Sequence, residues 1–421
     1  MEPSNHTRNQ SSVTVFILVG LSSFPEHQMF LFVVFTFIYM AALAGNLLIV
    51  LTITTSSRLH TPMYILLINL SLINLLSISV SIPKMLHNLL EHKKTIAFLG
   101  CIAQIYLFTW TLVSEVLVLA AMAFDRYLAI CHPLHYTIIM RKEVCVGLIA
   151  GIWIVGVANS AVHTGFVLQL SFCNWNIINH FFCELPPVLK LSCSDASLNE
   201  TLAFLADAVF GMGSCVITLM SYYFILRTIL KIRSTEGKKK AFSTCSSHLI
   251  VVSLYYSTAI YTYIHPSSAY SPDRDKVIAV LYSVITPALN PIIYSLRNNE
   301  VKEALRKLIR TFVPLLLTLT SYFYIITAIL RIPSTTGRKK AFSTCSSHLI
   351  VVTILYMSVI TVYVFPTSNT PKVLHKIFSL FYTVLTPMIN PVIYSLRNKE
   401  VKESIRKTIL KWVAFRNRHR N

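Results

Sequence analysis

Long apolar runs recur along the chain, each of about 20 residues or more, the length that a helix needs to cross roughly 30 Å of hydrocarbon. The 421 residues are 54% hydrophobic and only 13% charged, a composition that suits a lipid bilayer better than water. The sequence therefore predicts an all-α membrane protein. Ten candidate spans lie near residues 29–53, 63–86, 102–124, 144–168, 202–230, 243–264, 277–296, 312–330, 343–365 and 377–396.

The formal net charge of +20 raises the alternative of a nucleic-acid-binding protein, but the positions of the basic residues argue against it. They concentrate in the short loops after the first, third and fifth runs and in the tail after the seventh, whereas the opposite loops mix both signs. Cytoplasmic loops of membrane proteins carry such an excess of Lys and Arg. We therefore expect no nucleic-acid partner and a multi-pass protein of the lipid bilayer whose amino terminus is extracellular.

Residues 1–27 are polar and show no separate signal peptide, so the first apolar run is expected to serve for export. Two glycan acceptor triplets begin in this tail at Asn5 and Asn9. Because the tail is predicted to lie outside, both asparagines are candidate glycosylation sites.

The nine cysteines divide by the side of the membrane to which each is assigned. The outer side is oxidising and receives four cysteines with three alternative pairings: Cys101, Cys173, Cys183 and Cys193. The other five are expected to be reduced. His180, Cys183 and Glu184 are residue types that bind metals, but a disulfide at Cys183 would remove one of them, so we expect no metal and no cofactor.

The end of the chain repeats the segment before it. Residues 221–310 align with 321–410 without gaps, and about half of the positions are identical, most densely in AFSTCSSHLIVV (241–252 and 341–352). Solenoid repeats are short and stack side by side, whereas this unit is three helices long and occurs twice. The sequence therefore indicates a tandem copy of the end of a domain.

Seven motifs occur in order across the first 310 residues: GN (45–46), LHTPMY (59–64), PKML (83–86), MAFDRYLAICHPLHY (122–136), SY (221–222), KAFSTCSSHL (240–249) and PALNPIIYSLRN (287–298). In this order and spacing they resemble the olfactory receptors, a branch of the rhodopsin-like G-protein-coupled receptors. The resemblance implies a seven-transmembrane-helix bundle over residues 1–310 and, in 311–421, a partial second copy with two or three supernumerary helices. It also implies a plasma-membrane sensor of a small-molecule odorant that activates a stimulatory, heterotrimeric G protein.

The resemblance also assigns roles to the inner motifs. Asp125, Arg126 and Tyr127 would form an inactive-state lock that opens to admit the G protein, while the plainer interpretation is an Arg and Asp pair that snorkels to the interface. The other implied coupling residues are Tyr222, Asn290, Pro291 and Tyr294. The proline removes a helical hydrogen bond and permits a kink, and the tyrosine one turn away would change partner with that kink.

Glu115 lies inside the third apolar run, where a charge is costly enough to mark a functional site. The resemblance implies that this glutamate would hold a sodium ion together with an aspartate of the second helix. This chain has Asn74 at that position, which puts sodium binding in doubt. The alternative is a protonated Glu115 that hydrogen-bonds to Asn74 or Asn290.

The resemblance places the odorant among the outer halves of the third, fifth and sixth helices. The implied lining residues are Phe108, Thr109, Leu112, Val113, Ala206, Asp207, Phe210, Tyr256 and Tyr263. They are mostly apolar, as small-molecule sites usually are, and the plainer interpretation of each is packing between helices. Asp207 would either attract a cationic odorant or face the wet outer vestibule.

For the outer cysteines the resemblance implies two disulfides, Cys101 with Cys183 and Cys173 with Cys193. These bridges would tie the outer loop over the ligand site, so that the loop acts as a lid.

Other functions compete with this interpretation. A polytopic transporter would suit ten spans, but the chain shows no row of intramembrane charges and no pair of broken helices in matching halves. An enzyme would need a motif such as HExxH or GxSxG, and neither is present, so we expect no enzyme. The duplication also allows a non-functional or altered fusion product. If residues 312–330 span, the basic carboxyl-terminal tail falls outside, against the charge bias, whereas a non-spanning segment would leave nine spans.

Overall fold

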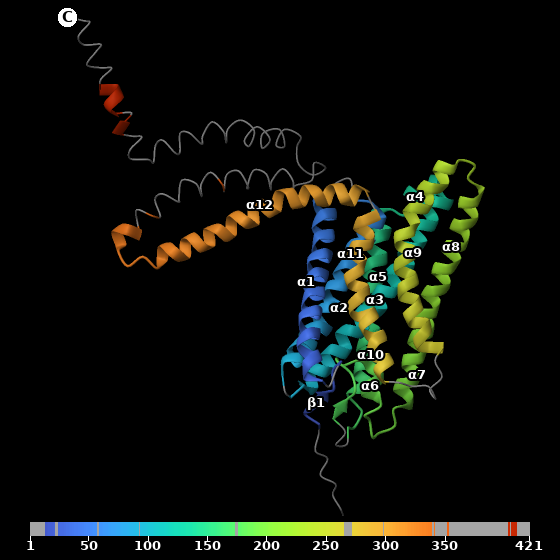
Figure 1. Cartoon of the computed structure of the whole chain (residues 1–421). Helices are drawn as coiled ribbons and strands as arrows, with labels where there is room; N and C mark the ends of the chain where they lie inside the picture. The colour runs from blue at the N-terminus through green and yellow to red at the C-terminus, as the bar shows by residue number, and fades with distance from the viewer. Residues whose placement is uncertain are drawn as a thin grey trace, which may run out of the picture. The chain divides into compact units, whose positions relative to one another are not determined.

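The computed structural model describes residues 13–21, 24–56, 59–91, 93–172, 176–264, 272–297, 299–338, 341, 352, 403–404 and 406–410 (Figure 1). The chain divides into two compact units, the first comprising Met1–Leu51 and His60–Lys302 and the second Thr52–Leu59 and Glu303–Asn421. Several predictions fall on residues outside the described ranges: the spans near 343–365 and 377–396, Cys173, and the glycan acceptors Asn5 and Asn9.

Helices occupy all seven runs predicted within the first 310 residues. They are α1 (Pro25–Thr55), α2 (Pro62–Leu90), α3 (Phe98–Cys131), α5 (Lys142–Val167), the consecutive α7 (Ser197–Ala206), η2 (Asp207–Met212) and α8 (Gly213–Lys231), then α9 (Thr235–Ile264), and finally α10 (Pro272–Val280), η4 (Leu281–Ile285) and α11 (Thr286–Arg297). Short helices α4 (Pro133–Ile139) and α6 (Leu185–Leu189) lie in the loops. Both η segments are single π-helical turns, a feature that is frequent at functional sites.

Six of the described helical stretches are long and apolar enough to cross a membrane. They are His27–Thr55, Pro62–Leu90, Phe98–Cys131, Lys142–Val167, Ser197–Lys231 and Arg274–Tyr294. α9 is not among them, because its first half carries the polar sequence TEGKKKAFSTCSSH. It nevertheless packs against α3, α8 and α11, so the predicted sixth helix has its place in the bundle.

α3 is the central helix of the first unit and packs against α2, α5, α8 and α9. Its buried residues extend from Cys101 near the outer end to Leu128 near the inner end. Gly156 of α5 lets the two helices approach closely, since a Cβ there would lie 2.5 Å from the Ser114 hydroxyl and 2.7 Å from the Trp110 ring. Any larger side chain at this glycine would have to displace α3.

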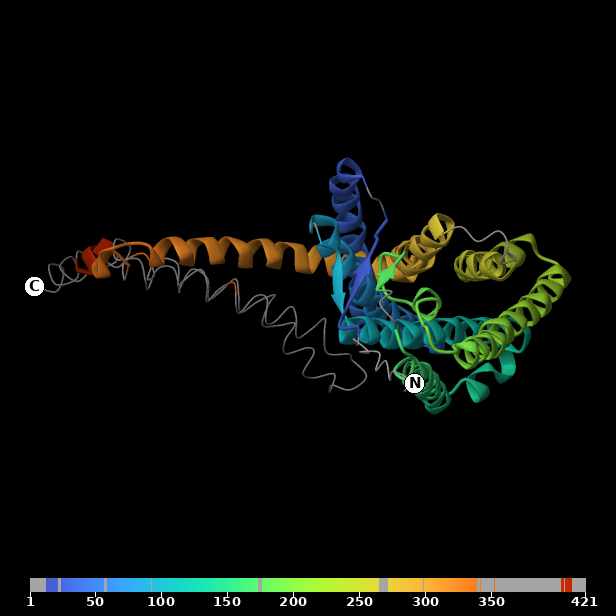
Figure 2. The ribbon, with the colours of Figure 1, turned by 90° about the horizontal axis from the view of Figure 1, so that it is seen from below.

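A small sheet closes one end of the bundle, with β1 (Val15–Leu18) between β2 (Thr95–Ala97) and β3 (Ile177–Ile178) (Figure 2). β1 pairs antiparallel with β2 and parallel with β3. Phe16 and Leu18 are almost fully buried, whereas Val15 and Ile17 are 40% and 38% exposed, the alternation of a strand with one covered face. The description of residues 1–27 as a polar tail is therefore wrong for this short segment, which is part of the outer core.

The predicted disulfide between Cys101 and Cys183 is confirmed, with the two Cα atoms 5.3 Å apart. It joins the start of α3 to the loop between α5 and α7, here called the outer loop. It lies in the same apolar cluster as Phe16, Ile96 and Phe172. Cys193 is also disulfide-bonded. Its expected partner Cys173 lies outside the described residues, so that pairing stays a prediction.

In the second unit the main described element is α12 (Asn299–Leu330), which begins at the end of the first unit and contains Pro314. From the sequence we expected a polar tail up to residue 310 and a new span at 312–330. The structure has one continuous helix across both. Within α12, Thr320–Leu330 is apolar but shorter than the stretches that are long enough to cross a membrane. Ser321–Leu330 is helical like its sequence counterpart Ser221–Leu230 in α8.

Substitution of Phe16 tests the outer sheet. Phe16→Ala removes a ring that packs edge-on against Phe172, with centroids 5.5 Å apart, and should destabilise the fold by about 3–5 kcal/mol. The thermal unfolding midpoint of the detergent-solubilised protein measures this loss. Val15→Ala, in the same strand but exposed, is the matched control. Equal midpoints for the two variants would show that β1 does not contribute to the core.

Substitution of Cys101 tests the disulfide. Cys101→Ser opens a covalent loop with a sequence separation of 82 residues, and loss of a native disulfide typically costs about 2–5 kcal/mol. We expect the variant to be lost from the cell surface, as measured by antibody labelling of intact cells. Cys215→Ser, which removes a half-buried free thiol, is the control and should be displayed normally. Normal display of both variants would contradict the structural role of the bridge.

Candidate functional site

The four α3 residues predicted to line the ligand site lie in the outer half of the helix. Phe108 and Val113 are buried, and Thr109 and Leu112 are half-buried. The Phe108 ring meets Phe182 of the outer loop edge-on, with centroids 4.9 Å apart, and has Tyr282 of η4 at 6.0 Å. Phe108 therefore lies where the third helix, the outer loop and the seventh helix meet.

Only some of the lining residues predicted on the fifth and sixth helices are buried or half-buried in this region. η2 packs against α3, and within the α7–η2 stretch Ala206 and Phe210 are half-buried. Asp207 is exposed, and the two roles predicted for it stay predictions. Tyr256 is buried, with its hydroxyl 3.3 Å from that of Thr218. The Tyr263 side chain lies outside what the structure describes.

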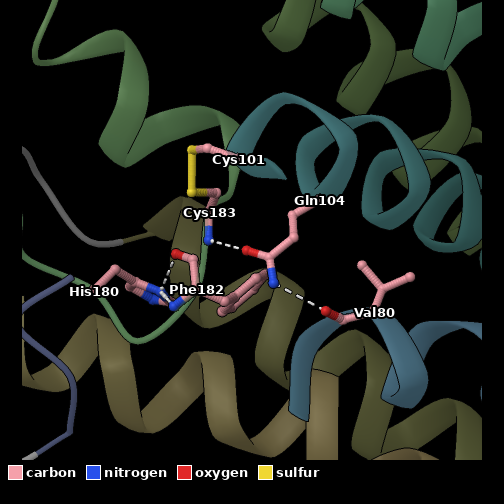
Figure 3. Close-up of a disulfide and its surroundings, with 6 residues drawn as sticks. All are labelled: Val80, Cys101, Gln104, His180, Phe182 and Cys183. Atoms are coloured by element: carbon pink, nitrogen blue, oxygen red, sulfur yellow. Dashed lines mark hydrogen bonds between the residues drawn. A yellow bond between two sulfur atoms is a disulfide. The ribbon is translucent and has the colours of Figure 1, made fainter. Parts of the chain in front are cut away.

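Gln104 is not among the predicted site residues, although its amide side chain lies one turn from Cys101. Its side-chain amide donates to the Val80 carbonyl of α2 at 2.9 Å, and its carbonyl oxygen accepts from the Cys183 backbone N–H at 3.0 Å (Figure 3). The residue is buried. The outer loop is thus fixed to α3 by a disulfide and, beside it, by a hydrogen bond.

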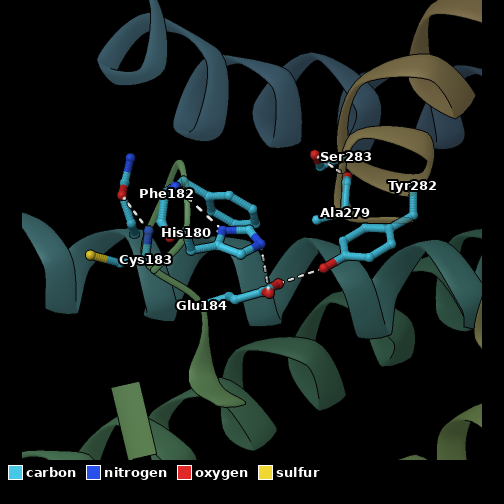
Figure 4. Close-up of polar contacts among 8 residues, drawn as sticks. His180, Phe182, Cys183, Glu184, Ala279, Tyr282 and Ser283 are labelled. Atoms are coloured by element: carbon cyan, nitrogen blue, oxygen red, sulfur yellow. Dashed lines mark hydrogen bonds and ion pairs between the residues drawn. The ribbon is translucent and has the colours of Figure 1, made fainter. Parts of the chain in front are cut away.

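Glu184 and Tyr282 were also missed as partners. Glu184 Oε1 lies 3.3 Å from His180 Nε2, and Oε2 accepts a hydrogen bond from the Tyr282 hydroxyl at 2.5 Å (Figure 4). Burial lowers the pKa of His180 below its usual value, against the opposing effect of the Glu184 carboxylate. The outer loop is therefore also joined to the seventh helix.

At the inner end of α3, the partner of Asp125 differs from the expected pair with Arg126. Asp125 Oδ1 accepts a hydrogen bond from the Tyr136 hydroxyl of α4 at 2.8 Å, and burial together with this carboxylate raises the pKa of Tyr136. Arg126 is 9% exposed and makes no salt bridge within the described part of the chain. Tyr127 is half-buried, with its hydroxyl 3.0 Å from His132 Nε2.

His248 of α9 connects three helices beside Arg126. Its Nδ1 lies 2.7 Å from the Tyr222 hydroxyl of α8, and its Nε2 lies 3.1 Å from the Leu119 carbonyl of α3. The histidine is buried, and the Arg126 charge acts on both His248 and Tyr222. A ring nitrogen that faces a carbonyl must donate, so Nε2 carries the hydrogen and Nδ1 accepts from Tyr222. His248 is not among the predicted site residues, although this histidine lies in the stretch that is most alike between the two copies.

The seventh-helix motif lies in α11, where Asn290 and Tyr294 are both buried. The Asn290 amide and the Tyr294 hydroxyl have no hydrogen-bond partner among the described residues. Pro291 packs closely against α1, because a Cβ on Gly45 would lie 3.0 Å from it. Such unpaired polar groups are costly to bury.

Glu115 is buried next to this region, but neither expected hydrogen bond is formed. Asn74 donates its amide to Asn46 Oδ1 at 3.2 Å, and the Asn290 amide has no partner among the described residues. Asn46 in turn donates to the Pro287 carbonyl at 3.0 Å, so it joins α1 to α2 and α11. Glu115 Oε1 has no partner within the described ranges. The predicted alternative of a bond from Glu115 to Asn74 or Asn290 is therefore not formed in this structure, in which Asn74 Oδ1 also has no partner among the described residues.

Comparisons with known proteins agree with this arrangement. A family model described as olfactory receptor matches residues 35–312 and again 309–412. Human olfactory receptor 13G1 is 48% identical over 299 residues, which are 71% of this chain and 97% of that protein. Human olfactory receptor 13A1 is 50% identical over 304 residues, 72% of this chain and 93% of that protein.

A solved structure shares the fold. The crystal structure of squid rhodopsin matches with a TM-score of 0.54 and 16% sequence identity, over 71% of this chain and 88% of that one. At this identity the match speaks for the helical bundle alone. The family match and the identities to the human receptors carry the assignment: the chain belongs to the olfactory receptor family of G-protein-coupled receptors, and it is not an enzyme.

Proposed function

We propose that the chain senses a small, mostly apolar odorant at the outer half of α3 and activates a stimulatory G protein at the inner end of the same helix. The observation that carries this proposal is the burial of α3, which bears both the Phe108 region and the Asp125–Arg126 pair. One helix that is packed on several sides offers a continuous route between two sites.

The outer site suits an apolar ligand. The residues assigned to it on α3 are Phe108, Thr109, Leu112 and Val113, of which only one has a polar side chain. Ala206, Phe210 and Tyr256 add apolar surface from the fifth and sixth helices. Sites of this kind bind through contact area and select through a few polar groups. Here the available polar groups are the Thr109 and Tyr256 hydroxyls, so a neutral odorant is favoured over a cation.

The inner network supplies an element that can switch. Because His248 is held by α8 and α3 together, movement of α9 away from α3 has to break a bond to Tyr222 or to the Leu119 carbonyl. Once those bonds are lost, α9 could move away from the buried Arg126 and expose it to a partner. A ligand shifts such an equilibrium only by its difference in affinity for the two packings, and a ligand lodged against Phe108 supplies that difference.

The proposed orientation puts the β1 end outside. The confirmed disulfide lies at this end, as an oxidising compartment requires, and the glycan acceptor triplets precede β1 in sequence. The basic loops are at the other end, which is then cytoplasmic. This orientation suits a plasma-membrane receptor that meets odorants from outside.

For the duplicated segment, we place the first copy of the sixth and seventh helices in the working bundle. α9 follows α8 after a short connection, and short connections favour neighbouring elements. The first copy is also synthesised earlier. Residues 1–310 would therefore be the receptor, and 311–421 would lie outside its bundle.

Arg126→Ala tests the coupling role. We expect the variant to reach the surface and to lose about tenfold or more of the cyclic AMP response to whichever odorant best activates the unmodified chain, the usual scale of an allosteric coupling. Arg141→Ala removes an exposed arginine at the start of α5 and is the matched control. An undiminished response of Arg126→Ala at equal surface amount would make Arg126 an interfacial anchor instead.

Truncation tests the domain assignment. A chain that ends at Arg310 should reach the surface and respond to the same odorants as the full chain, because it keeps α1 to α11. The comparison is a chain that lacks 221–320 and so has only the second copy. A silent truncated chain beside a responsive deletion would make the second copy the functional one.

A further inference from the structure

We propose that Glu184, His180 and Tyr282 form a latch that fastens the outer loop to the seventh helix and controls access of ligands to the space beside α3. The proposal rests on the ligand site given above and adds the device that closes it. None of these residues belongs to the predicted lining or coupling residues.

The latch joins two segments that are 98 residues apart in sequence. Glu184 directly follows the disulfide-bonded Cys183, and Tyr282 lies in the π-helical turn η4. The Leu281 carbonyl accepts two hydrogen bonds from Thr286, one from its backbone N–H, as in a π-helical turn, and one from its hydroxyl at 3.0 Å. One carboxylate therefore connects the loop both to itself, through His180, and to the seventh helix (Figure 4).

The protonation of His180 follows from its neighbours. Its Nδ1 faces the Phe182 backbone, with the N–H at 3.4 Å and the carbonyl at 3.2 Å, while Nε2 faces Glu184. A neutral ring that donated from Nδ1 would present a lone pair to the carboxylate, which is repulsive. Nδ1 can therefore donate to the Phe182 carbonyl or accept from its N–H, and Nε2 meets the carboxylate best when it carries a hydrogen. The charges that act on this ring are those of Glu184, Asp275 and Lys276.

The loop has other attachments besides the latch. The disulfide and Gln104 hold it to α3, and the Gly20 N–H donates to the His180 carbonyl at 3.1 Å, which extends the β1 pairing (Figure 3). Phe181 and Phe182 pack in one apolar cluster with Phe108 and Val284. If the Glu184–Tyr282 bond breaks, the loop stays tethered to α3 and can lift on the side of η4. This motion would uncover the Phe108 region without unfolding the loop.

Cysteine labelling tests the latch without an identified odorant. A reporter cysteine is introduced as Leu112→Cys, and its reaction with a membrane-impermeant methanethiosulfonate is timed on intact cells. Tyr282→Phe removes the hydroxyl and keeps the ring, and should raise the labelling rate about tenfold, which corresponds to 1.4 kcal/mol in the opening equilibrium. Glu184→Gln should raise it in the same direction. The double variant should label no faster than the faster single one, because both remove the same contact.

Tyr106→Phe is the matched control, since it removes a tyrosine hydroxyl from the outer half of α3, where its ring packs against Trp110. It should label at the same rate as the chain that carries Leu112→Cys alone. The chain without Leu112→Cys sets the background. Equal rates for Tyr282→Phe, Glu184→Gln and Tyr106→Phe would overturn the latch while leaving the ligand site in place. Absence of labelling in every variant would overturn both, because Leu112 would then not line a space reached from outside.

Discussion

The close packing of α3 against α2, α5, α8 and α9 is the constraint on which the rest of the first unit depends. The neighbouring helices approach it closely, as Gly156 of α5 opposite Ser114 and Trp110 shows. A helix packed in this way transmits displacement along its length, since protein interiors are nearly as dense as crystals. The outer loop is bonded to the start of this helix, and Asp125 and Arg126 are at its end.

Buried polar groups join the helices of this bundle at particular points. Asn46 is satisfied by three helices, and His248 likewise joins α3, α8 and α9. Asn290 and Tyr294 have no partner among the described residues, although both are buried. In a medium of low dielectric constant, a hydrogen-bonded polar group stabilises one packing of the helices, whereas an unpaired polar group raises the free energy of the folded state.

Much of this could be predicted from the sequence, because the length of an apolar run and the order of motifs are local properties. The helices over the first 310 residues and the bridge between Cys101 and Cys183 agree with the expectations. β1 was missed because a strand of four residues gives too short an alternation to stand out in a polar tail. α12 was divided in two because a basic, polar segment up to Arg310 gives way to an apolar run, a change in composition that the helix passes through.

The sequence by itself determined the class of protein, the positions of its helices and the residue types at both ends of α3. Only the tertiary structure decided which side chains meet: Asp125 with Tyr136, Tyr222 with His248, and Glu184 with Tyr282. It also decided that Asp207 is exposed. The physical reason is that hydrophobic periodicity fixes the buried face of a helix only to within a broad sector. A hydrogen bond between distant segments depends on rotation and on a few tenths of an ångström in separation, which packing of the whole bundle sets.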